Sequence, residues 1–351
     1  MSTKAPMIRL APIPLSSLPN HPSFETDHSN TRPDLVHFAL TLLDQGRALV
    51  QPTEFNLHFK SHSWKPSPPS ENEIEILSTS VGASNLAKIP WSSDQVLRPK
   101  PTKLEDEFWY ARRSNHHSPS AKRSAPGTAS WNKFIYGLRD QHSKHEFDFT
   151  PTIYDAKLIC EWNDELNRLL SAVPAQQTSS KQPRYTHATM SIYEMCHELP
   201  SPIGPRCFPV LVITASCSEN EFVAVTVPVD IRNFNSSFYS SGRNTREGLD
   251  VETKKAVTLG QYCAVERVHR FPTQAMHSNA KEQVPDHTRD GEDIEWIMAT
   301  ASNARGNIPM VMQRLGIPGA IAKDVGLFLK WIHDVPEEEV RTQQPGTSTA
   351  R

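Results

Sequence analysis

Apolar residues recur at helical spacing along the last part of the chain, between residues 308 and 332. The residues that share this face are Ile308, Val311, Met312 and Leu315, continued beyond 316–318 by Ile321, Val325, Phe328 and Ile332. Pro318 lies inside the pattern and predicts a kink or a brief break, because proline cannot donate to the preceding turn. A short strand at 296–298 precedes it. The pattern therefore predicts a long C-terminal helix that covers a broad apolar surface.

That surface is a sheet, because several upstream stretches have the character of β-strands. The predicted strands are 108–114, 189–197, 210–215, 222–231 and 261–269. The polar residues 216–220 between two of these runs indicate a hairpin, so the strands are expected to pair antiparallel. Antiparallel strands closed by one long helix predict an α+β fold.

Three further helices are expected in the first half of the chain. One begins near Thr31 and ends near Gly46, and a second is capped by Ser130 and continues to Leu138. A third pattern follows Pro151 and includes Leu158, Ile159, Trp162, Leu166, Leu169 and Leu170. Polar insertions are expected at 115–126 and 271–293.

These elements predict one folded domain with irregular flanks. Residues 1–30 are expected to be disordered, and 31–104 to hold the opening helix followed by an irregular linker rich in proline and serine. The domain itself spans 105–335, and 336–351 form a disordered tail. Composition agrees with much irregular chain, since there are 29 prolines against 14 glycines and the mean hydropathy is −0.51.

Charge and cysteine content narrow the classes of partner and compartment. The net charge is −2, which disfavours a nucleic-acid partner. The five cysteines contain no CxxC pair, no signal-like segment opens the chain, and no run of 18 apolar residues occurs. A cytoplasmic protein with reduced thiols is expected.

Four separated blocks of sequence carry a resemblance to a known family. They are GTASW at 127–131, FTPTIYDAKLICEW at 149–162, SIYEMCHELPSPIGPRCFPVLV at 191–212 and MATASNARGNIP at 298–309. In this order they resemble a fungal family of unknown function that is grouped with the START-like (Bet v 1-like, helix-grip) lipid-binding folds. The resemblance covers about 105–333.

The resemblance implies a curved antiparallel sheet that grips the C-terminal helix, with a ligand tunnel between them. The expected function is a non-catalytic carrier or sensor of a hydrophobic small molecule or lipid, without a cofactor. The residues expected to line the tunnel are Ile192, Leu211, Ile213, Val223, Val225, Val227 and Val265 on strands, and Val311, Leu315, Val325 and Leu329 on the helix. A closed core that these residues simply fill is the open alternative.

Charged residues among apolar strands are the candidates for contact with a ligand's polar group. Glu194 and Arg206 are predicted to contact the ligand, and a structural ion pair between the two is the alternative. Glu266 and Arg267 also lie in a predicted strand. Transient membrane contact near Phe328, Leu329 and Trp331 is left open.

No catalytic or metal-binding motif emerges from the sequence. His142, His145 and Glu146 do not match a zinc motif, and they are interpreted as a solvated helix end. Two other function classes remain: a polyketide cyclase- or hydrolase-like enzyme, and an interaction module with a filled core. The enzyme would be marked by Glu194, His197 or Tyr193 converging in the tunnel. No oligomeric state is predicted.

Overall fold

The structure is a computed structural model that describes ten stretches of the chain. They are residues 7–24, 32–91, 100–101, 103–119, 125–172, 185–201, 203–244, 257–272, 291–306 and 310–342. The predicted disorder of 1–6, 25–30 and 343–351 concerns residues outside these stretches, as does most of the predicted insertion at 271–293.

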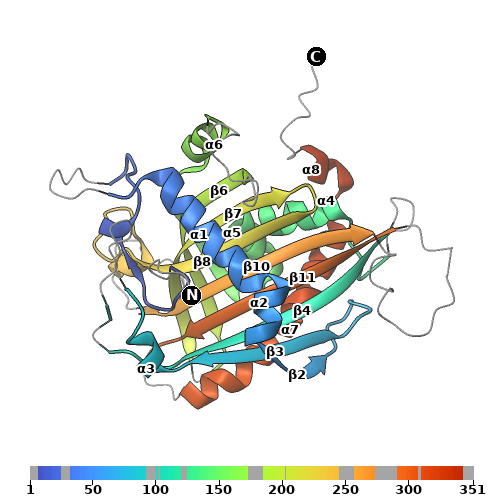
Figure 1. The fold of residues 1–351 in the computed structure, drawn as a ribbon, viewed down its shortest axis with the longest axis horizontal. Helices are drawn as coiled ribbons and strands as arrows, with labels where there is room; N and C mark the ends of the chain where they lie inside the picture. Colours follow the sequence, from blue (N-terminus) through green and yellow to red (C-terminus); the bar gives the residue numbers. More distant parts are fainter. Residues whose placement is uncertain are drawn as a thin grey trace.

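One curved antiparallel sheet crosses the whole molecule (Figure 1). Its strands in spatial order are β2 (Lys60–Lys65), β3 (Ile74–Val81), β4 (Glu107–Pro119), β11 (Gly291–Asn303), β10 (Gln261–Pro272), β8 (Glu221–Asp230), β7 (Gly204–Ser218), β6 (Thr186–Leu199) and β5 (Ile153–Glu161). Two short strands join it in parallel: β1 (Ile13–Pro14) pairs with β8, and β9 (Thr258–Leu259) pairs with β7. The first strands thus meet the last one through the pair of β4 and β11.

Helices cover both faces of the sheet. On one face, in front in Figure 1, lie the N-terminal segment 7–24, α1 (Leu35–Val50), α2 (Pro52–His58) and α6 (Asn163–Ala172). On the other lie α4 (Trp131–Phe134), the π-helix η2 (Ile135–Arg139), α5 (His142–Phe149), α7 (Met310–Asp334) and α8 (Glu337–Thr342). We call these surfaces the α1 face and the α7 face. The α+β class with a sheet packed on a long C-terminal helix is confirmed.

The helix α1 is fixed by its cap and by ion pairs with the sheet. Asp34 accepts a hydrogen bond from the backbone of His37 at 2.8 Å, which caps the first turn. Near the other end, Arg47 pairs with Glu221 at 2.6 Å, and Glu221 also receives two hydrogen bonds from Arg267. Burial raises the pKa of Glu221, but the two arginines outweigh this and hold it below its ordinary value.

The helix α7 runs without interruption through Pro318, so no break occurs there. Its second half carries the buried residues Ile321, Val325, Phe328, Leu329 and Ile332, which pack on the α7 face. Gly326 lies directly against residues 67–68: a Cβ at this position would be 2.3 Å from the carbonyl oxygen of Pro68. The close approach therefore requires glycine.

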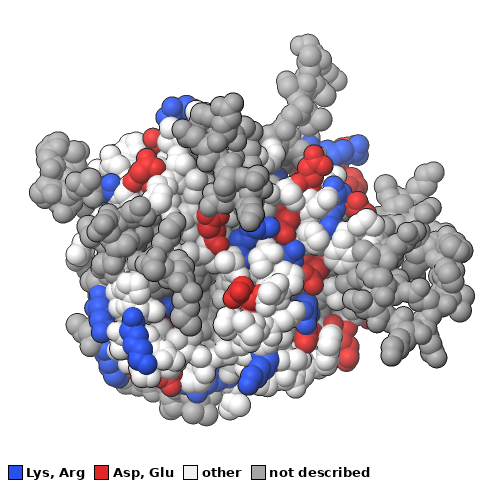
Figure 2. All heavy atoms as spheres, viewed as in Figure 1, with Lys and Arg blue, Asp and Glu red and all other residues white. Residues whose placement is uncertain are grey.

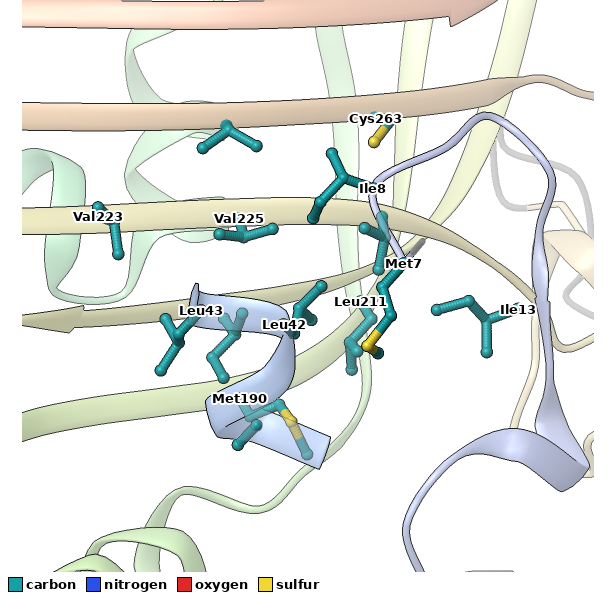
Figure 3. Packing of buried hydrophobic residues seen from close by; sticks show 14 of the residues in the cluster. Met7, Ile8, Ile13, Leu42, Leu43, Met190, Leu211, Val223, Val225 and Cys263 are labelled. Carbon is teal, nitrogen blue, oxygen red and sulfur yellow. The ribbon is translucent and has the colours of Figure 1, made fainter. Parts of the chain in front are cut away.

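Several expectations about the first half of the chain are wrong. The segment 7–24 is not disordered, because Met7 and Ile13 are fully buried on the α1 face and β1 pairs with β8 (Figure 3). The stretch 51–104 is not largely irregular: it holds α2, the hairpin of β2 and β3, and the short helix α3 (Ala83–Leu86). The sheet thus begins well before residue 105.

Two errors arise from ambiguous local patterns. The predicted helix from Pro151 to Leu170 is an edge strand, β5, followed by α6, because the apolar spacing of 158–162 also suits a strand that pairs with β6. The polar residues after 114 extend β4 to Pro119 rather than forming a loop. The helix capped by Ser130 is confirmed, since its side chain accepts from the backbone of Lys133 at 3.4 Å.

Candidate functional site

The strand residues predicted to line a tunnel lie on the α1 face, away from α7. All seven are fully buried in one apolar cluster, namely Ile192, Leu211, Ile213, Val223, Val225, Val227 and Val265. Figure 3 shows Leu211 and Val225 beside Leu42 of α1 and Met7 of the N-terminal segment. Side chains alternate between the faces of a strand, and these seven lie on the face opposite to α7, so they do not face the helix as predicted.

The helix residues predicted for the tunnel have different environments. Val325 and Leu329 are fully buried against the α7 face. Leu315 is 79% exposed and faces solvent, so its assignment to the tunnel is wrong. The side chain of Val311 lies outside the described residues.

Glu194 and Arg206 are not an ion pair, and each has a structural role. The Glu194 carboxylate accepts three backbone hydrogen bonds from Phe238, Tyr239 and Ser240, at 2.8, 3.1 and 2.5 Å. Arg206 donates to the carbonyl oxygens of Ala304, Ile203 and Pro205 at 2.6–2.9 Å. Both groups are thereby satisfied by loops that they hold in place.

A different group of charged residues lies between the sheet and α7. Glu266 stands opposite Met298, and Met298 opposite Arg112, so the three form a row across β10, β11 and β4. The Arg112 guanidinium lies 3.7 Å over the ring of Trp296, and its Nη2 is 3.6 Å from Glu266 Oε2. The Trp296 indole N–H donates to the same Glu266 oxygen at 2.7 Å. We call Arg112, Glu266 and the residues described next the inner polar cluster.

The helices contribute three more members to the inner polar cluster. From α5, His142 has its Nε2 3.8 Å from Glu266 Oε1, while its Nδ1 donates to the Leu138 carbonyl oxygen at 2.7 Å. Glu146 follows one turn later on the same helix. Asp324 comes from α7. The earlier interpretation of His142 and Glu146 as a solvated helix end is wrong, because His142 is buried and Glu146 is half-buried.

Burial shapes the ionisation of this cluster. It raises the pKa of Glu146 to about 7, an effect opposed by His142 and reinforced by the charges of Glu266 and Asp324. It likewise raises the pKa of Asp324 to about 6, against the attraction of Arg112. The phenol of Tyr262 on β10 also has a raised pKa, chiefly through burial. His116 on β4 has its pKa lowered to about 3 by burial and by Arg112, so it is neutral near pH 7.

Several polar atoms of the cluster have no hydrogen-bond partner among the described residues. Nε and Nη1 of Arg112 are buried and unpartnered, although this side chain is only 1% exposed. The carboxyl groups of Glu146 and Asp324 make neither a hydrogen bond nor an ion pair within the described parts of the chain, and both residues are half-buried. Since buried polar groups in folded proteins are almost always satisfied, the two Arg112 nitrogens are suited to hold an acceptor group of a polar guest.

Apolar side chains surround the inner polar cluster. On one side, Trp296 and Phe328 belong to the core beneath α7. On the other, Met195, Phe208 and Val210 form a smaller cluster on β6 and β7. Tyr262 packs against both groups. A polar centre between two apolar walls can receive a molecule that has both a polar and an apolar part.

A hollow of about 720 Å³ lies elsewhere, at the ends of β4, β8, β10 and β11. Leu10, Trp91, Phe108 and Ile317 are among its lining residues. Two pairs of charged groups lie in its wall, Lys103 with Glu105 and Arg232 with Asp230, both at 2.6 Å, whereas the buried Nε of Arg314 in the same wall has no hydrogen-bond partner among the described residues. The hollow therefore has space for a ligand and, at Arg314, a polar atom that is free to receive one.

The residues named as marks of an enzyme do not form one site. Glu194 is held by backbone groups on the α1 face, whereas His197 lies against Phe208. Burial lowers the pKa of His197 to about 4 and raises that of Tyr193. Among the described residues no cluster suited to hold a metal ion is found.

Surface charge and the apolar content of the helices bear on whether the protein contacts nucleic acids or membranes. Figure 2 shows lysine, arginine, aspartate and glutamate interspersed over the α1 side of the molecule. No helix among the described residues is both long and apolar enough to cross a bilayer. Phe328 and Leu329, considered for membrane contact, are fully buried in the core beneath α7.

Solved structures of lipid-transfer domains align with most of this chain, at low sequence identity. Human StAR-related lipid transfer protein 5 aligns with a TM-score of 0.41 and 8% identity, over 83% of this chain and 96% of that one. The human StarD13 (DLC2) lipid transfer and protein localization domain aligns with a TM-score of 0.38 and 10% identity, over 82% of this chain and 98% of that one. A STAR-related lipid transfer protein from Xanthomonas axonopodis aligns with a TM-score of 0.33 and 11% identity, over 80% of this chain and 99% of that one.

Comparison of the sequence with known families assigns the chain to a family, but it assigns no activity. No curated protein matches the chain. A family model matches residues 109–332, from β4 into the last turns of α7, and so covers most of the sheet, α5 and α7 together with the inner polar cluster. The chain therefore belongs to the family described as "Protein of unknown function (DUF3074)".

Proposed function

We propose that the protein binds a hydrophobic small molecule or lipid between the α7 face of the sheet and the helices that cover it, as a carrier or sensor. One observation carries this proposal: among the described residues, Nε and Nη1 of Arg112 are buried in an otherwise apolar layer without a hydrogen-bond partner. A ligand with a polar group at these atoms and an apolar part against Phe208 and Val210 satisfies both surroundings.

Energetics support a functional reason for this cluster. An unpaired charge or an unsatisfied polar group inside an apolar layer lowers the free energy of unfolding. A core of the same size that was packed only with apolar side chains would avoid this cost. Folded proteins keep such groups mainly where they act on a ligand. The charges on the α1 face differ in this respect, since Arg267 is fully paired with Glu221 and Glu295.

Substitution of Arg112 tests the proposal directly. Replacing Arg112→Met is expected to weaken uptake of an apolar fluorescent probe or a spin-labelled lipid by about tenfold, which corresponds to about 1.4 kcal/mol. The measurement is a titration followed by fluorescence or by electron paramagnetic resonance. The melting temperature is recorded alongside it, to show that the variant is folded.

The adjacent residue offers a matched control. Arg113 lies on the same strand but on the α1 face, where it pairs with Glu75 at 2.5 Å. Arg113→Met removes the same charge from the same strand, and it is expected to leave uptake unchanged. If both variants bind as the wild type does, or both lose binding equally, the ligand is not held at Arg112.

A second function is favoured by the ionisation of the same cluster. Carboxyl groups with pKa values of about 7 and about 6 can act as general acid and base near neutral pH. The cluster thereby supports a cyclase- or hydrolase-like reaction on a bound substrate. Incubation with polyketide-like and ester substrates tests this candidate: the binding proposal expects release of unchanged ligand, and the catalytic one expects product that disappears in Glu146→Gln.

The proposed location is cytoplasmic, and it rests on the thiols. All five cysteines are buried, including Cys196 and Cys207, which stand directly opposite each other on β6 and β7. Reduced thiols so placed are typical of a reducing compartment. Fluorescence microscopy of the tagged protein in its own cells tests this, and an exclusively secreted or vesicular signal would refute it.

A further inference from the structure

The hollow of about 720 Å³ at the ends of β4, β8, β10 and β11 is a separate place from the inner polar cluster. The described residues that line it come mainly from 10–14, from 86–108, from the four strand ends and from α7, and none of them belongs to the inner polar cluster. Its volume lies within the range of sites for small molecules. A ligand in the hollow would therefore be held by its own set of residues.

The acidic side chains in the described part of this wall are already engaged. Two of them, Glu105 and Asp230, form ion pairs at 2.6 Å. The other two, Asp106 and Glu107, accept backbone hydrogen bonds at 2.8 and 3.0 Å. None of the four is thus left to receive a cation from a ligand.

Three cationic side chains in the same wall have no carboxylate partner within the described stretches. Lys100 donates to a backbone carbonyl oxygen at 3.3 Å, and Nε of Arg305 donates to the side-chain amide oxygen of Gln261 at 3.2 Å. Both acceptors are neutral. Arg314 has no hydrogen-bond partner at all for its buried Nε in the described parts of the chain. The charge left unpaired in the hollow is therefore positive.

Arg314 has the geometry of an anchor for an acid. Its guanidinium carbon lies 3.0 Å from the centroid of the Phe108 ring, and both residues line the hollow. Stacking covers one face of the guanidinium plane and leaves the N–H groups at its edge to other partners. That edge matches the two oxygens of a carboxylate, which it binds through two parallel hydrogen bonds.

We infer that this hollow binds a small organic acid, with its carboxylate on the guanidinium of Arg314 and its apolar part against Leu10, Phe108 and Ile317. The site goes beyond the proposed function, because it shares no residue with the inner polar cluster. An unpartnered buried donor calls for an acceptor, and a carboxylate supplies one together with the opposite charge.

The acids in the wall limit the charge of this ligand. Asp106 and Glu107 have no cation among the described lining residues as a close partner, so their charges offset part of the field of Lys100, Arg305 and Arg314. A single negative charge is balanced by the excess that remains, whereas a doubly charged phosphate would meet more repulsion. A monocarboxylate is therefore favoured over a phosphate ester.

Ligands with one chain and different heads test the inference. Octanoate, octanol, octylamine and octyl phosphate are titrated at pH 7.5, where the carboxylic acid is ionised, and binding is followed by calorimetry. Octanoate is expected to bind at least about tenfold more tightly than octanol, which corresponds to the gain from one charge-assisted contact. Octylamine is expected to bind more weakly than octanol, and octyl phosphate more weakly than octanoate.

Substitutions assign the preference to Arg314. Arg314→Gln is expected to lose about tenfold in affinity for octanoate and to keep its affinity for octanol. Arg314→Lys keeps the charge without the planar fork, and a smaller loss is expected. Lys330→Gln is the matched control, since Lys330 is exposed on the same helix and does not line the hollow. Melting temperatures show that the variants are folded.

The position of the bound acid separates this inference from the proposed function. A diazirine analogue of octanoate, cross-linked by light and mapped by peptide mass spectrometry, is expected to label 10–14 and 100–108. Labelling of α5 or of 321–332, with binding lost in Arg112→Met and kept in Arg314→Gln, would place the acid in the layer beneath α7. That result would refute the site in the hollow and support the proposed function.

The remaining outcomes bear on the hollow alone. If octanoate does not bind, or binds no more tightly than octanol, the inference is overturned. Tightest binding of octylamine or octyl phosphate would overturn it as well, and so would an equal loss of octanoate binding in Arg314→Gln and Lys330→Gln. The proposed function is tested independently of these results, by the uptake of a lipid probe in Arg112→Met and Arg113→Met.

Discussion

Arg112 lies on β4, where its side chain is buried between the sheet and α7. It is 1% exposed, stacks on Trp296, and makes one ion pair at 3.6 Å, yet two of its nitrogens have no hydrogen-bond partner in the described parts of the chain. A buried arginine that only stabilised the fold would be expected to have its N–H groups satisfied, as those of Arg267 are by Glu221 and Glu295. This contrast between the two arginines is the reason for proposing that Arg112 contacts a ligand and that Arg267 is structural.

Glu146 gives a prediction about stability and its pH dependence. Its pKa in the folded protein is about 7, above the ordinary value of 4.5, so the fold favours the protonated form. The cost of ionising it is absent below about pH 4.5, grows between there and pH 7, and is full above. Glu146→Gln removes that cost and is expected to raise the free energy of unfolding by about 2 kcal/mol at pH 8.

Urea unfolding at two pH values checks this expectation. Wild type and Glu146→Gln are expected to differ at pH 8 and to coincide near pH 4.5, where both side chains are neutral. A variant that is less stable than the wild type at pH 8 would show that Glu146 has a counter-charge in the folded protein.

At the scale of elements, the position of α7 depends on one glycine. A Cβ at Gly326 would stand 2.3 Å from the Pro68 carbonyl oxygen, and its backbone N–H donates to Ser67 Oγ at 2.9 Å. Gly326→Ala is expected to push α7 from residues 67–68 and to lower the free energy of unfolding by about 2–4 kcal/mol. The change is measured by chemical denaturation.

The same helix offers the matched control. Gly319 has no atom within 4 Å of an added Cβ, and it lies in the exposed half of α7. Gly319→Ala is expected to leave stability unchanged or to raise it by up to about 1 kcal/mol, because alanine favours the helix. Equal effects of the two substitutions would contradict the close packing of α7 on residues 67–68.

Sequence patterns identified the six central strands of the sheet, β4, β6, β7, β8, β10 and β11, but not the face of the sheet that α7 covers. In β7 and β8 nearly every residue is buried, because helices cover both faces. Such strands lack the alternation of polar and apolar residues that would reveal their orientation. Leu211 and Val225 were therefore assigned to the tunnel, although they lie beneath α1.

Other misses have equally local causes. The strand β2 is exposed along most of its length, so it carries no apolar pattern from which to predict it. The segment 7–24 is short and rich in proline, and only its contacts with the sheet explain its order. Glu266 was noted as a charge within a predicted strand, but its neighbours Arg112, Glu146 and Asp324 come from β4, α5 and α7. Only the fold brings these distant residues together.

At the scale of the whole molecule, the sheet separates two different layers. The α1 face is a core closed by α1 and residues 7–24, with paired charges at its edge. The α7 face combines an apolar core with unpartnered polar groups at its centre. This division of one layer for stability and one for binding is the central claim.

Native mass spectrometry of the protein purified from its own host, with organic extraction of whatever is bound, tests that claim most directly. Wild type and Arg113→Met are expected to carry the same discrete co-purifying amphiphile, and Arg112→Met to carry markedly less of it. A wild-type protein that is found only at its polypeptide mass, and that takes up nothing from a broad lipid panel, would contradict the account.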